Sequence, residues 1–526
     1  MKLNLNKVIL SLITLLSLFA IFCSISIGMS WDEPQHHFNG AIRANYLKSF
    51  DFGKFEFSGG WAQFHPGLYD TFTFIIVDLL LKIFPEKLIE IRHLINLFFS
   101  FLTLIGLFLI SKKNFNKEIA YLATFLCFIN PFFFGHTAIN PKDTIICFAL
   151  IWFAYSVYMY CVNFDNKRLK FLILASFFMG FGLGTRASFF VITAPIVLSA
   201  LIFIIKNKNR YRDNKVFKKI FFDIFIFGSI SFSLMILAWP YVHADFGVLL
   251  ETVINSTKWI AGPIFEMMNG NIFETTNIPR TYFLSFFIFR IPIFTLILLF
   301  SLFIFLKMDR KFFSLKFSNF KNKIIVILCI ILFPMLLATA MQVKLYNGIR
   351  LFLFIIPFVS LLTAICFYYI LENFKKSIYI KTLLGVVTIF FLLFIQRFIY
   401  LTPYHYDYSN FLYPKFVNTQ KLHIHDYWAT SYKELMKLIG KNSNIKKINT
   451  DFCGGDPHGI KYLANKYSGG KVTFVPYEQA DYIIMINTLS IHPDDNSTCF
   501  SARPGTNILE VKRLGVIFSV LRKLDK

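Results

Sequence analysis

The apolar run Val8–Met29, VILSLITLLSLFAIFCSISIGM, is followed closely by the polar stretch Trp31–His37, WDEPQHH. A run of this length can cross a bilayer as a helix, so the polar stretch lies where the chain leaves the membrane. Two adjacent carboxylates, Asp32 and Glu33, are costly so close to hydrocarbon. One interpretation is a helix start, with Glu33 as its cap and Pro34 in its first turn. The other is an acidic pair with a chemical role.

The composition predicts a polytopic membrane protein. The chain has 526 residues, of which 56% are hydrophobic, with 68 Phe and a mean hydropathy of +0.57. A net charge of +24 would suggest a nucleic-acid partner for a soluble protein. Here the basic residues cluster in short loops between apolar runs, as orientation in a membrane requires. We therefore expect membrane lipid, and no nucleic acid, around this chain.

Eleven apolar runs are long enough to span a bilayer, which predicts an all-α polytopic bundle with a cytoplasmic N-terminus. The segment 68–84 is apolar too, but charged residues interrupt it, so we expect it at the interface or packed on the bundle. Counting it as a crossing would destroy the concentration of Lys and Arg on one side. The eleven runs are 8–29, 90–110, 118–134, 143–161, 169–184, 187–205, 219–239, 281–306, 323–340, 350–371 and 380–400.

The composition becomes polar from Thr402 onward, which divides the chain into two predicted domains. Residues 1–401 form the membrane module, whose first external loop, 30–89, carries the acidic pair. Residues 402–526 form a small extracytoplasmic α/β domain in which Cys453 and Cys499 can form one disulfide. Its predicted elements are a helix at 427–440, strands near 446–452, 472–475 and 481–487, and a hairpin in 508–521 that turns at Leu514-Gly515.

The other informative polar residues fall on the same side of the membrane as Asp32. A transporter or lipid flippase, the alternative from another class, would place its ionisable groups near the bilayer centre. One-sided placement favours an enzyme whose substrate has a lipid tail in the membrane and a polar head at its surface. These residues are His136, Asn140, Lys142, Asp143, Arg186, Arg280, Lys344, Tyr346, Asn347, Arg350, Tyr404, His405, Tyr406 and Tyr408.

The first external loop contains further polar candidates. Residues 34–49 have the pattern of an amphipathic helix lying in the interface. His36 and His37 have helical spacing from Asp32 and Glu33 and could gather one metal ion, but their order is not that of a zinc-protease motif. His65 is either a packing histidine at the interface or a substrate contact.

Five motifs in order resemble a known family. They are Asp32-Glu33, the stretch 140–143 (NPKD), the stretch 347–350 (NGIR) before a Phe-rich span, the stretch 403–410 (PYHYDYSN) and the stretch 426–431 (DYWATS). Residues 31 to about 432 are thus similar to membrane glycosyltransferases of the GT-C type, most of all to bacterial protein O-mannosyltransferases (glycosyltransferase family 39). Two departures concern the acceptor more than the reaction. The loop 240–280 cannot hold the soluble insert of eukaryotic members, and Leu351 stands where many relatives have His.

The resemblance implies an inverting transfer of a sugar, a hexose such as mannose, from a polyprenyl-phosphate donor to an acceptor hydroxyl. Asp32 matches the family's catalytic aspartate, with Glu33 as its partner, and a carboxylate suits the base that such a transfer needs. Cationic groups should hold the departing phosphate, and the alternative for each is a snorkelling or orientation charge. The candidates for this role are Lys142, Arg186 and Arg350. The candidates for other substrate contacts are His65, Asn140, Asp143, Tyr346, Tyr404, Tyr408 and Asp426.

The resemblance also implies where the reaction takes place and with what partners. We expect the outer face of a bacterial inner membrane, a protein acceptor and no obligatory metal, although a divalent cation would be compatible. An enzyme that modifies lipid A or a surface polysaccharide would share the donor and the catalytic residues, so this alternative stays open. For the stretch around Asp426, docking of the C-terminal domain on the bundle is the alternative to an acceptor site.

Overall fold

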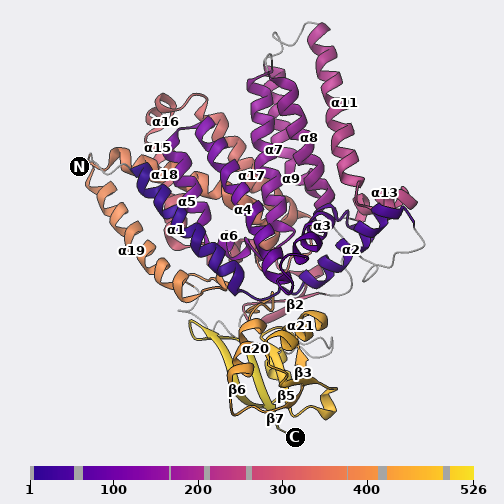
Figure 1. Ribbon diagram of the computed structural model, residues 1–526. Helices are drawn as coiled ribbons and strands as arrows, with labels where there is room; N and C mark the ends of the chain where they lie inside the picture. The colour runs from indigo at the N-terminus through magenta and orange to yellow at the C-terminus, as the bar shows by residue number, and fades with distance from the viewer. Residues whose placement is uncertain are drawn as a thin grey trace.

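The structure is a computed structural model that describes residues 5–51, 63–164, 167–206, 214–255, 264–375, 377–412, 423–489 and 498–525. Residues 52–62 of the predicted first external loop therefore lie outside the described residues. A bundle of helices stands on a small domain that contains a β-sheet (Figure 1). The chain is a multi-pass membrane protein with the predicted all-α bundle and C-terminal α/β domain.

Nine helices of the described residues have the length and hydropathy of a membrane span. The last but one, α18 with the short η4 before it, is largely buried and lies at the centre of the bundle against α5 and α15. The spans are α1 (Leu5–Ser26), α4 (Leu88–Asn114), α7 (Asp143–Val162), α8 (Arg168–Thr185), α9 (Phe189–Lys206), α11 (Asn214–Ile236), α17 (Phe320–Ala340), η4 and α18 (Arg350–Ile355 and Ile356–Asn373) and α19 (Ile378–Tyr400).

Two of the eleven predicted spans are broken. The run 118–134 forms α5 (Lys117–Phe128) and a separate short α6 (Pro131–His136). Between them Asn130 caps α6 by accepting hydrogen bonds from the backbone N–H groups of Phe132 and Phe133. A cap followed by proline is a strong helix-start signal, so the second helix begins anew rather than continuing the first.

The run 281–306 forms α14 (Tyr282–Arg290) and α15 (Ile293–Met308), which meet at an angle of 111°. Ile291 has extended backbone dihedrals (φ −91°, ψ 137°) and precedes Pro292. A residue before proline is pushed out of the helical region, so the break falls where the sequence puts this proline. Even when the bent pair is counted as one span, the described helices supply ten candidates instead of eleven.

Two helices between α1 and α4 do not span the membrane. The helix α2 (Glu33–Ser49) and the apolar α3 (Leu68–Leu81) pack on each other, and α3 also packs on α4 and α8. Both lie at the end of the bundle that faces the sheet domain (Figure 1). The expectation for segment 68–84, packing on the bundle without crossing, agrees with this placement.

The C-terminal domain has a five-stranded sheet in the order β4-β3-β5-β7-β6. The strand β3 pairs in parallel with β4 and β5, and β7 is antiparallel to both β5 and β6. The predicted strands and the hairpin at Leu514-Gly515 are present, while α21 was not predicted. The elements are α20 (Tyr432–Lys441), β3 (Ile448–Cys453), α21 (Pro457–Tyr467), β4 (Val472–Phe474), β5 (Tyr482–Ile486), α22 (Cys499–Ala502), β6 (Gly505–Arg513) and β7 (Val516–Leu524). A disulfide joins Cys453 and Cys499.

Short elements complete the connections between the spans. A hairpin of β1 (Phe265–Met268) and β2 (Asn271–Glu274) precedes α14, and it matters for the site described below. The remaining elements are α12 (Pro240–Ala244), α13 (Gly247–Asn255), η3 (Thr275–Asn277), α16 (Arg310–Lys316), η5 (His405–Asp407) and η7 (Tyr477–Gln479).

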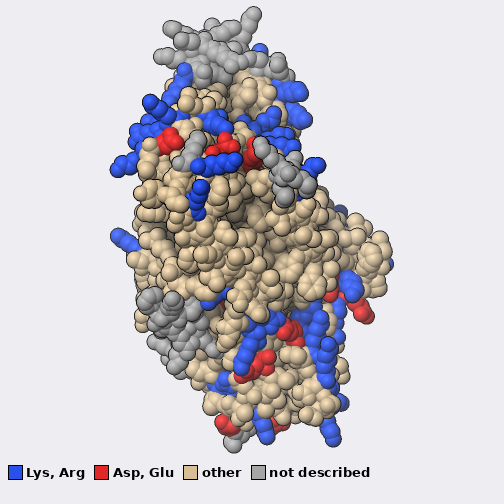
Figure 2. Space-filling view, turned by 90° about the vertical axis from the view of Figure 1, so that its left-hand side faces the viewer, with Lys and Arg blue, Asp and Glu red and all other residues tan. Residues whose placement is uncertain are grey.

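The surface shows where the bilayer surrounds the bundle. On the face drawn in Figure 2, a broad band with few charges separates Lys and Arg at the far end of the bundle from the charged residues of the sheet domain. Many large apolar side chains of the spans are exposed, among them Leu15, Phe221 and Phe300. This surface suits contact with lipid rather than water.

Candidate active site

The segment between α1 and α2 is fixed by the start of the C-terminal domain. The backbone N–H of Trp31 donates to the carbonyl of Trp428 at 2.9 Å. A Cβ on Gly28 would meet the carbonyl of Thr430, so only glycine allows this close approach. Two distant parts of the chain therefore meet backbone to backbone beside the acidic pair.

A lysine from the C-terminal domain also holds the end of α1. Lys433 of α20 is buried, and its Nζ donates to the carbonyl oxygens of Ile25 at 2.7 Å and Ile27 at 3.1 Å. The last carbonyls of a helix have no partner within it, and a cation satisfies them and complements the helix dipole. Burial lowers the pKa of Lys433 to about 8, although Glu90 nearby opposes this effect.

Asp32 presents an accessible carboxylate. It occupies the N-cap position of α2 but makes no side-chain hydrogen bond to the helix. Its side chain is 42% exposed, and Nη1 of Arg350 lies 3.7 Å from its Oδ2. A carboxylate that is open on one side can be reached by an acceptor hydroxyl, as a general base requires.

Glu33 faces the opposite way, into the bundle. It accepts a hydrogen bond from the backbone N–H of Ser30 at 2.5 Å, and a ring nitrogen of His93 lies 3.2 Å from its carboxylate. Nε of Arg92 lies 3.8 Å away. Burial alone would raise the pKa of Glu33, but His93 and Arg92 lower it below its usual value. The prediction that Glu33 caps the helix is wrong, because Asp32 occupies the N-cap position, without a side-chain hydrogen bond to the helix, and Glu33 is the first helical residue. A direct part of Glu33 in catalysis stays a prediction.

Arg350 is held between two aromatic rings. Its guanidinium carbon lies 4.6 Å from the ring centroid of Tyr346 and 4.4 Å from that of Trp428. Stacking on two faces fixes the plane of a guanidinium, which then keeps a defined direction for its hydrogen-bond donors. Tyr346 is close to Arg350 in the chain, and its predicted contact with substrate stays a prediction. Trp428 comes from a distant segment and was not predicted to contact Arg350.

The loop before α7 holds a second arginine. Nη2 of Arg186, at the end of α8, lies 3.0 Å from Oδ1 of Asp143. Asn140 fixes that aspartate by donating to its Oδ2 at 2.9 Å and accepting from its backbone N–H at 2.9 Å. Asn140 and Asp143 therefore position Arg186, and their predicted contact with substrate stays a prediction.

Lys142 lies among several charged groups at the start of α7. Burial lowers the pKa of its ammonium and Arg186 lowers it further, while the charges of Asp70, Asp32 and Asp143 oppose this. The ion pairs Arg350–Asp32 and Arg186–Asp143, with Lys142 next to Asp143 in the chain, place the three predicted cations and Asp32 in one cluster. A negatively charged headgroup would find three cationic side chains there.

The cluster also contains Asp70 and His36, which the sequence analysis did not assign to it. Nδ1 of His36 lies 3.0 Å from Oδ2 of Asp70. Burial alone would raise the pKa of Asp70, but His36, Lys142 and Arg43 bring it to about 2. Burial lowers the pKa of His65 well below its usual value, and Lys142, Arg186 and Arg43 add to this, which leaves His65 neutral. An ionisable residue inside the apolar segment 68–84 was the available sequence signal for Asp70.

A buried glutamate positions the loop that carries Arg350. Glu266 of β1 accepts a hydrogen bond from the backbone N–H of Asn347, and the backbone N–H of Gly348 donates to the hydroxyl of Tyr282 at 2.8 Å. Asn347 and Gly348 both have positive φ, 56° and 67°, so the turn needs these anchors. Glu266 was not among the predicted site residues, because no motif surrounds it.

The remaining candidates join the bundle to the C-terminal domain instead of entering the cluster. The hydroxyl of Tyr404 donates to Oε2 of Glu434 at 2.7 Å, and the ring of Tyr408 packs against Phe394. Asp426 is buried and accepts from the hydroxyl of Tyr406 and from backbone N–H groups of the following turn. This geometry favours docking for the stretch around Asp426, and a role of these residues in substrate binding stays a prediction.

No metal centre is formed by the residues that the structure describes. Among them, no group of three or more His, Cys, Asp and Glu side chains has an arrangement that could hold a metal ion. His37 instead lies 3.3 Å from Nη1 of Arg92, so the two neighbouring histidines point to different partners.

The arrangement of the whole chain is similar to a known enzyme fold. The crystal structure of ArnT from Cupriavidus metallidurans in the apo state matches with a TM-score of 0.51 and 9% identity, covering 98% of this chain and 97% of that chain. The structure of the same protein bound to undecaprenyl phosphate matches with a TM-score of 0.50 and 10% identity, covering 97% of each chain. The fold is therefore that of the GT-C membrane glycosyltransferases.

A protein-family model matches part of the chain. Residues 71–236 match the model of the PMT_2 family, described as dolichyl-phosphate-mannose-protein mannosyltransferase. No curated protein sequence matches the chain. The chain therefore has the GT-C fold over its length and is similar to this family over residues 71–236.

Proposed function

We propose that the protein transfers a sugar from a polyprenyl-phosphate donor to an acceptor hydroxyl at the membrane surface. The observation that carries the proposal is the accessible carboxylate of Asp32 beside the stacked guanidinium of Arg350, with Lys142 and Arg186 in the same charged cluster. ArnT, which shares the fold, has been crystallised with undecaprenyl phosphate. A phosphate on a long apolar tail suits a cationic site at the end of a membrane bundle.

The chemistry follows from the placement of the charges. Asp32 takes the proton of the acceptor hydroxyl as its oxygen forms a bond to the anomeric carbon of the sugar. The bond from that carbon to the phosphate oxygen breaks, and its electron pair leaves with the phosphate. The phosphate gains negative charge, which Arg350, Lys142 and Arg186 stabilise. Attack from the face opposite the phosphate inverts the anomeric centre.

The reaction takes place outside the cytoplasm in this proposal. The Lys and Arg residues of the short loops concentrate at the end of the bundle away from the sheet domain, which the positive-inside rule assigns to the cytoplasm. The Cys453–Cys499 disulfide belongs to the opposite end and suits an oxidising compartment. We therefore place the N-terminus in the cytoplasm and the C-terminal domain in the periplasm of a bacterial inner membrane.

The sugar and the acceptor are the finer part of the proposal. The family model that matches residues 71–236 supports mannose as the sugar and a protein as the acceptor. The segment between α12 and α14 contains only short elements, α13, the β1–β2 hairpin and η3, among its described residues, which favours the second candidate, a lipid A or surface-polysaccharide acceptor. Both candidates use the same donor and the same base, and the reaction is proposed to proceed without an obligatory metal.

The test compares purified wild-type protein with Asp32→Asn in a transfer assay with polyprenyl-phosphate mannose. We expect a fall in the rate of about 10²–10⁴-fold, typical of a lost general base. Arg280→Lys, a change at an exposed position outside the cluster, is the matched control and should retain activity. A rate for Asp32→Asn close to that of the wild type would show that Asp32 is not the general base. Mass analysis of glycoproteins and surface lipids from a deletion strain then separates the two acceptors.

A further inference from the structure

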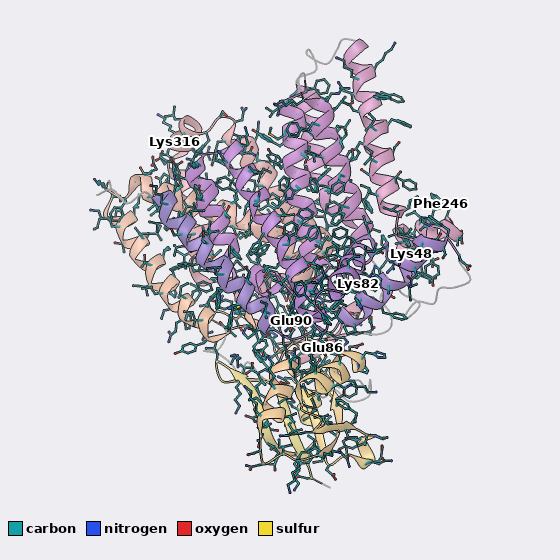
Figure 3. All side chains as sticks on the ribbon, viewed as in Figure 1. Lys48, Lys82, Glu86, Glu90, Phe246 and Lys316 are labelled. Atoms are coloured by element: carbon teal, nitrogen blue, oxygen red, sulfur yellow. A yellow bond between two sulfur atoms is a disulfide. The ribbon has the colours of Figure 1, made fainter. Side chains whose placement is uncertain are left out.

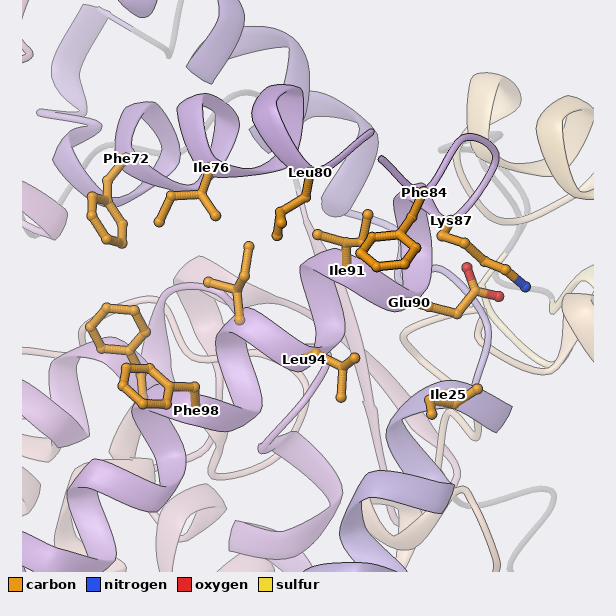
Figure 4. A pocket seen from close by; sticks show the side chains of 12 residues that line it. Ile25, Phe72, Ile76, Leu80, Phe84, Lys87, Glu90, Ile91, Leu94 and Phe98 are labelled. Atoms are coloured by element: carbon orange, nitrogen blue, oxygen red, sulfur yellow. The ribbon is translucent and has the colours of Figure 1, made fainter. Parts of the chain in front are cut away.

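An apolar groove of about 560 Å³ runs between α3 and α4 and ends beside α1. One wall consists of Phe72, Ile76 and Leu80, which share one face of α3, and the other includes Leu94 and Phe98 of α4. Figure 4 shows these side chains facing each other along the groove. The volume falls in the range of roughly 300–1,000 Å³ that is typical of small-molecule sites.

Charged residues gather at one end of this groove. Lys87 and Glu90 close it at the first turn of α4 (Figure 4). Lys433 and Lys466 of the C-terminal domain lie 3.7 and 4.0 Å from the carboxylate of Glu90. Lys437 adds a further positive charge, because its ammonium lies 5.2 Å from the ring centroid of Tyr467, beside this group. The four lysines Lys87, Lys433, Lys437 and Lys466 therefore outnumber Glu90 and the neighbouring Glu86 at this end of the groove.

The groove lies at the depth of lipid headgroups. Its charged end coincides with the start of the span α4, and Glu86 and Glu90 lie at the junction of bundle and sheet domain in Figure 3. From there the apolar walls extend along the bundle toward Phe72 and Phe98. Cations at the interface above an apolar slot match a molecule with an anionic head and a hydrocarbon tail.

We propose that this groove binds an anionic phospholipid, with one acyl chain between α3 and α4 and the phosphate at Lys87 and Lys466. A neutral lipid would not use the lysines at this end of the groove. The polyprenyl-phosphate donor is assigned to the cluster around Arg350, whose residues take no part in lining the groove.

Residues of α4 and α20 connect the charged end of the groove to the acidic pair Asp32-Glu33. Glu90 is followed within one turn by Arg92 and His93, which hold Glu33. Lys433, which reaches Glu90, also anchors the end of α1. A phosphate bound by Lys87 and Lys466 would link the bundle to the C-terminal domain. This link would lie where α4 begins and α1 ends.

The first test uses wild-type protein and a phosphatidylglycerol with a photoreactive acyl chain. Mass spectrometry should find labels concentrated on α3 and α4, and unlabelled phosphatidylglycerol should compete at least about tenfold better than phosphatidylcholine. Labels spread evenly over lipid-facing helices such as α19 would overturn the proposal. Competition by polyprenyl phosphate that exceeds that of phosphatidylglycerol would overturn it too, since the groove would then be a carrier site.

The second test uses variants. Leu94→Trp fills the groove, and Lys87→Gln with Lys466→Gln removes its cations; both should abolish the selective labelling. Leu79→Trp, on an exposed face of α3 outside the groove, and Lys461→Gln, on the exposed side of α21, are matched controls that should label as the wild type does. Full labelling of Leu94→Trp would contradict the proposal. Labelling does not require turnover, so its result stands whether or not Asp32 proves to be the base.

Discussion

Asp32 and Glu33 are neighbours in the chain, yet their side chains lie in opposite environments. The carboxylate of Asp32 is 42% exposed and pairs with Arg350, whereas that of Glu33 is 4% exposed and lies against Arg92 and His93. One member of the pair faces the space that a substrate would enter, and the other faces the protein core. Their substitution should therefore damage the protein in two different ways.

For Asp32→Asn we expect loss of transfer with an unchanged melting temperature, because the side chain is 42% exposed and makes no cap bond to the helix. For Glu33→Gln we expect a lower free energy of unfolding, by roughly 3 kcal/mol, because Arg92 and His93 lose a buried countercharge. Thermal unfolding in detergent and transfer assays on both variants check this. A lower melting temperature for Asp32→Asn would contradict the absence of a structural role for Asp32. A Glu33→Gln variant as stable as the wild type would contradict the structural role of Glu33.

Arg350→Lys should be a severe change although it keeps the charge. A lysine cannot stack between Tyr346 and Trp428 or donate in two parallel directions, so we expect kcat/KM for the donor to fall by about tenfold or more. Steady-state kinetics with varied donor concentration measure it, with Arg280→Lys as the control at an exposed arginine. Unchanged kinetics in Arg350→Lys would mean that a point charge is sufficient and that the stacking has no role in binding.

Glu266→Gln should change the pH dependence of stability. Burial raises the pKa of Glu266 to about 7 from a usual value of 4.5, although the hydrogen bonds from Asn347, Tyr282 and Met267 and the charge of Arg290 oppose this. The folded protein therefore binds a proton more tightly than the unfolded chain, so stability falls as the pH rises from about 4.5 to about 7.

The glutamine variant lacks this titration. Relative to the wild type it should gain stability between pH 4.5 and 8, by roughly 3 kcal/mol at most, at about 1.4 kcal/mol per pH unit. Melting temperatures of both proteins across that range measure the difference. A difference that does not vary with pH would show that Glu266 is ionised throughout or protonated throughout.

Transfer should continue after metal is removed. The base and the three cations of the proposed site are all side chains, so the phosphate can be held without a divalent ion. We expect the same rate after treatment with EDTA and after readdition of Mg²⁺ or Mn²⁺. Loss of activity on chelation, with recovery by one of these cations, would show that a metal takes part.

Much of the fold follows from hydropathy and turn chemistry within single segments. The apolar runs predict where helices lie, and the pair Leu514-Gly515 predicts the last hairpin, because each signal is local. The breaks at Asn130 and at Pro292 were visible as residues, yet an apolar run was extended across each of them. Length and hydropathy alone do not distinguish a continuous span from one that a helix cap or a proline interrupts.

The sequence predicted part of the proposed site, but not Asp70 and His36 and not the pairing of the residues. Asp32, Lys142, Arg186 and Arg350 come together as the topology implied. The stacking of Trp428 on Arg350 depends on contacts between segments that lie far apart in the chain, and periodicity carries no information about such contacts. The same limit explains why Tyr404 was expected near the substrate, although its hydroxyl pairs with Glu434.

The hold of the C-terminal domain on α1 has a consequence for biogenesis. Lys433 and Trp428, which anchor the end of α1 and Trp31, are made by the ribosome long after the first helix has been inserted. Domains of a nascent chain fold in the order of their synthesis, so the acidic pair takes its final position only when the last domain docks. A chain that ends before Trp428 therefore lacks the contacts that hold Trp31 and the end of α1.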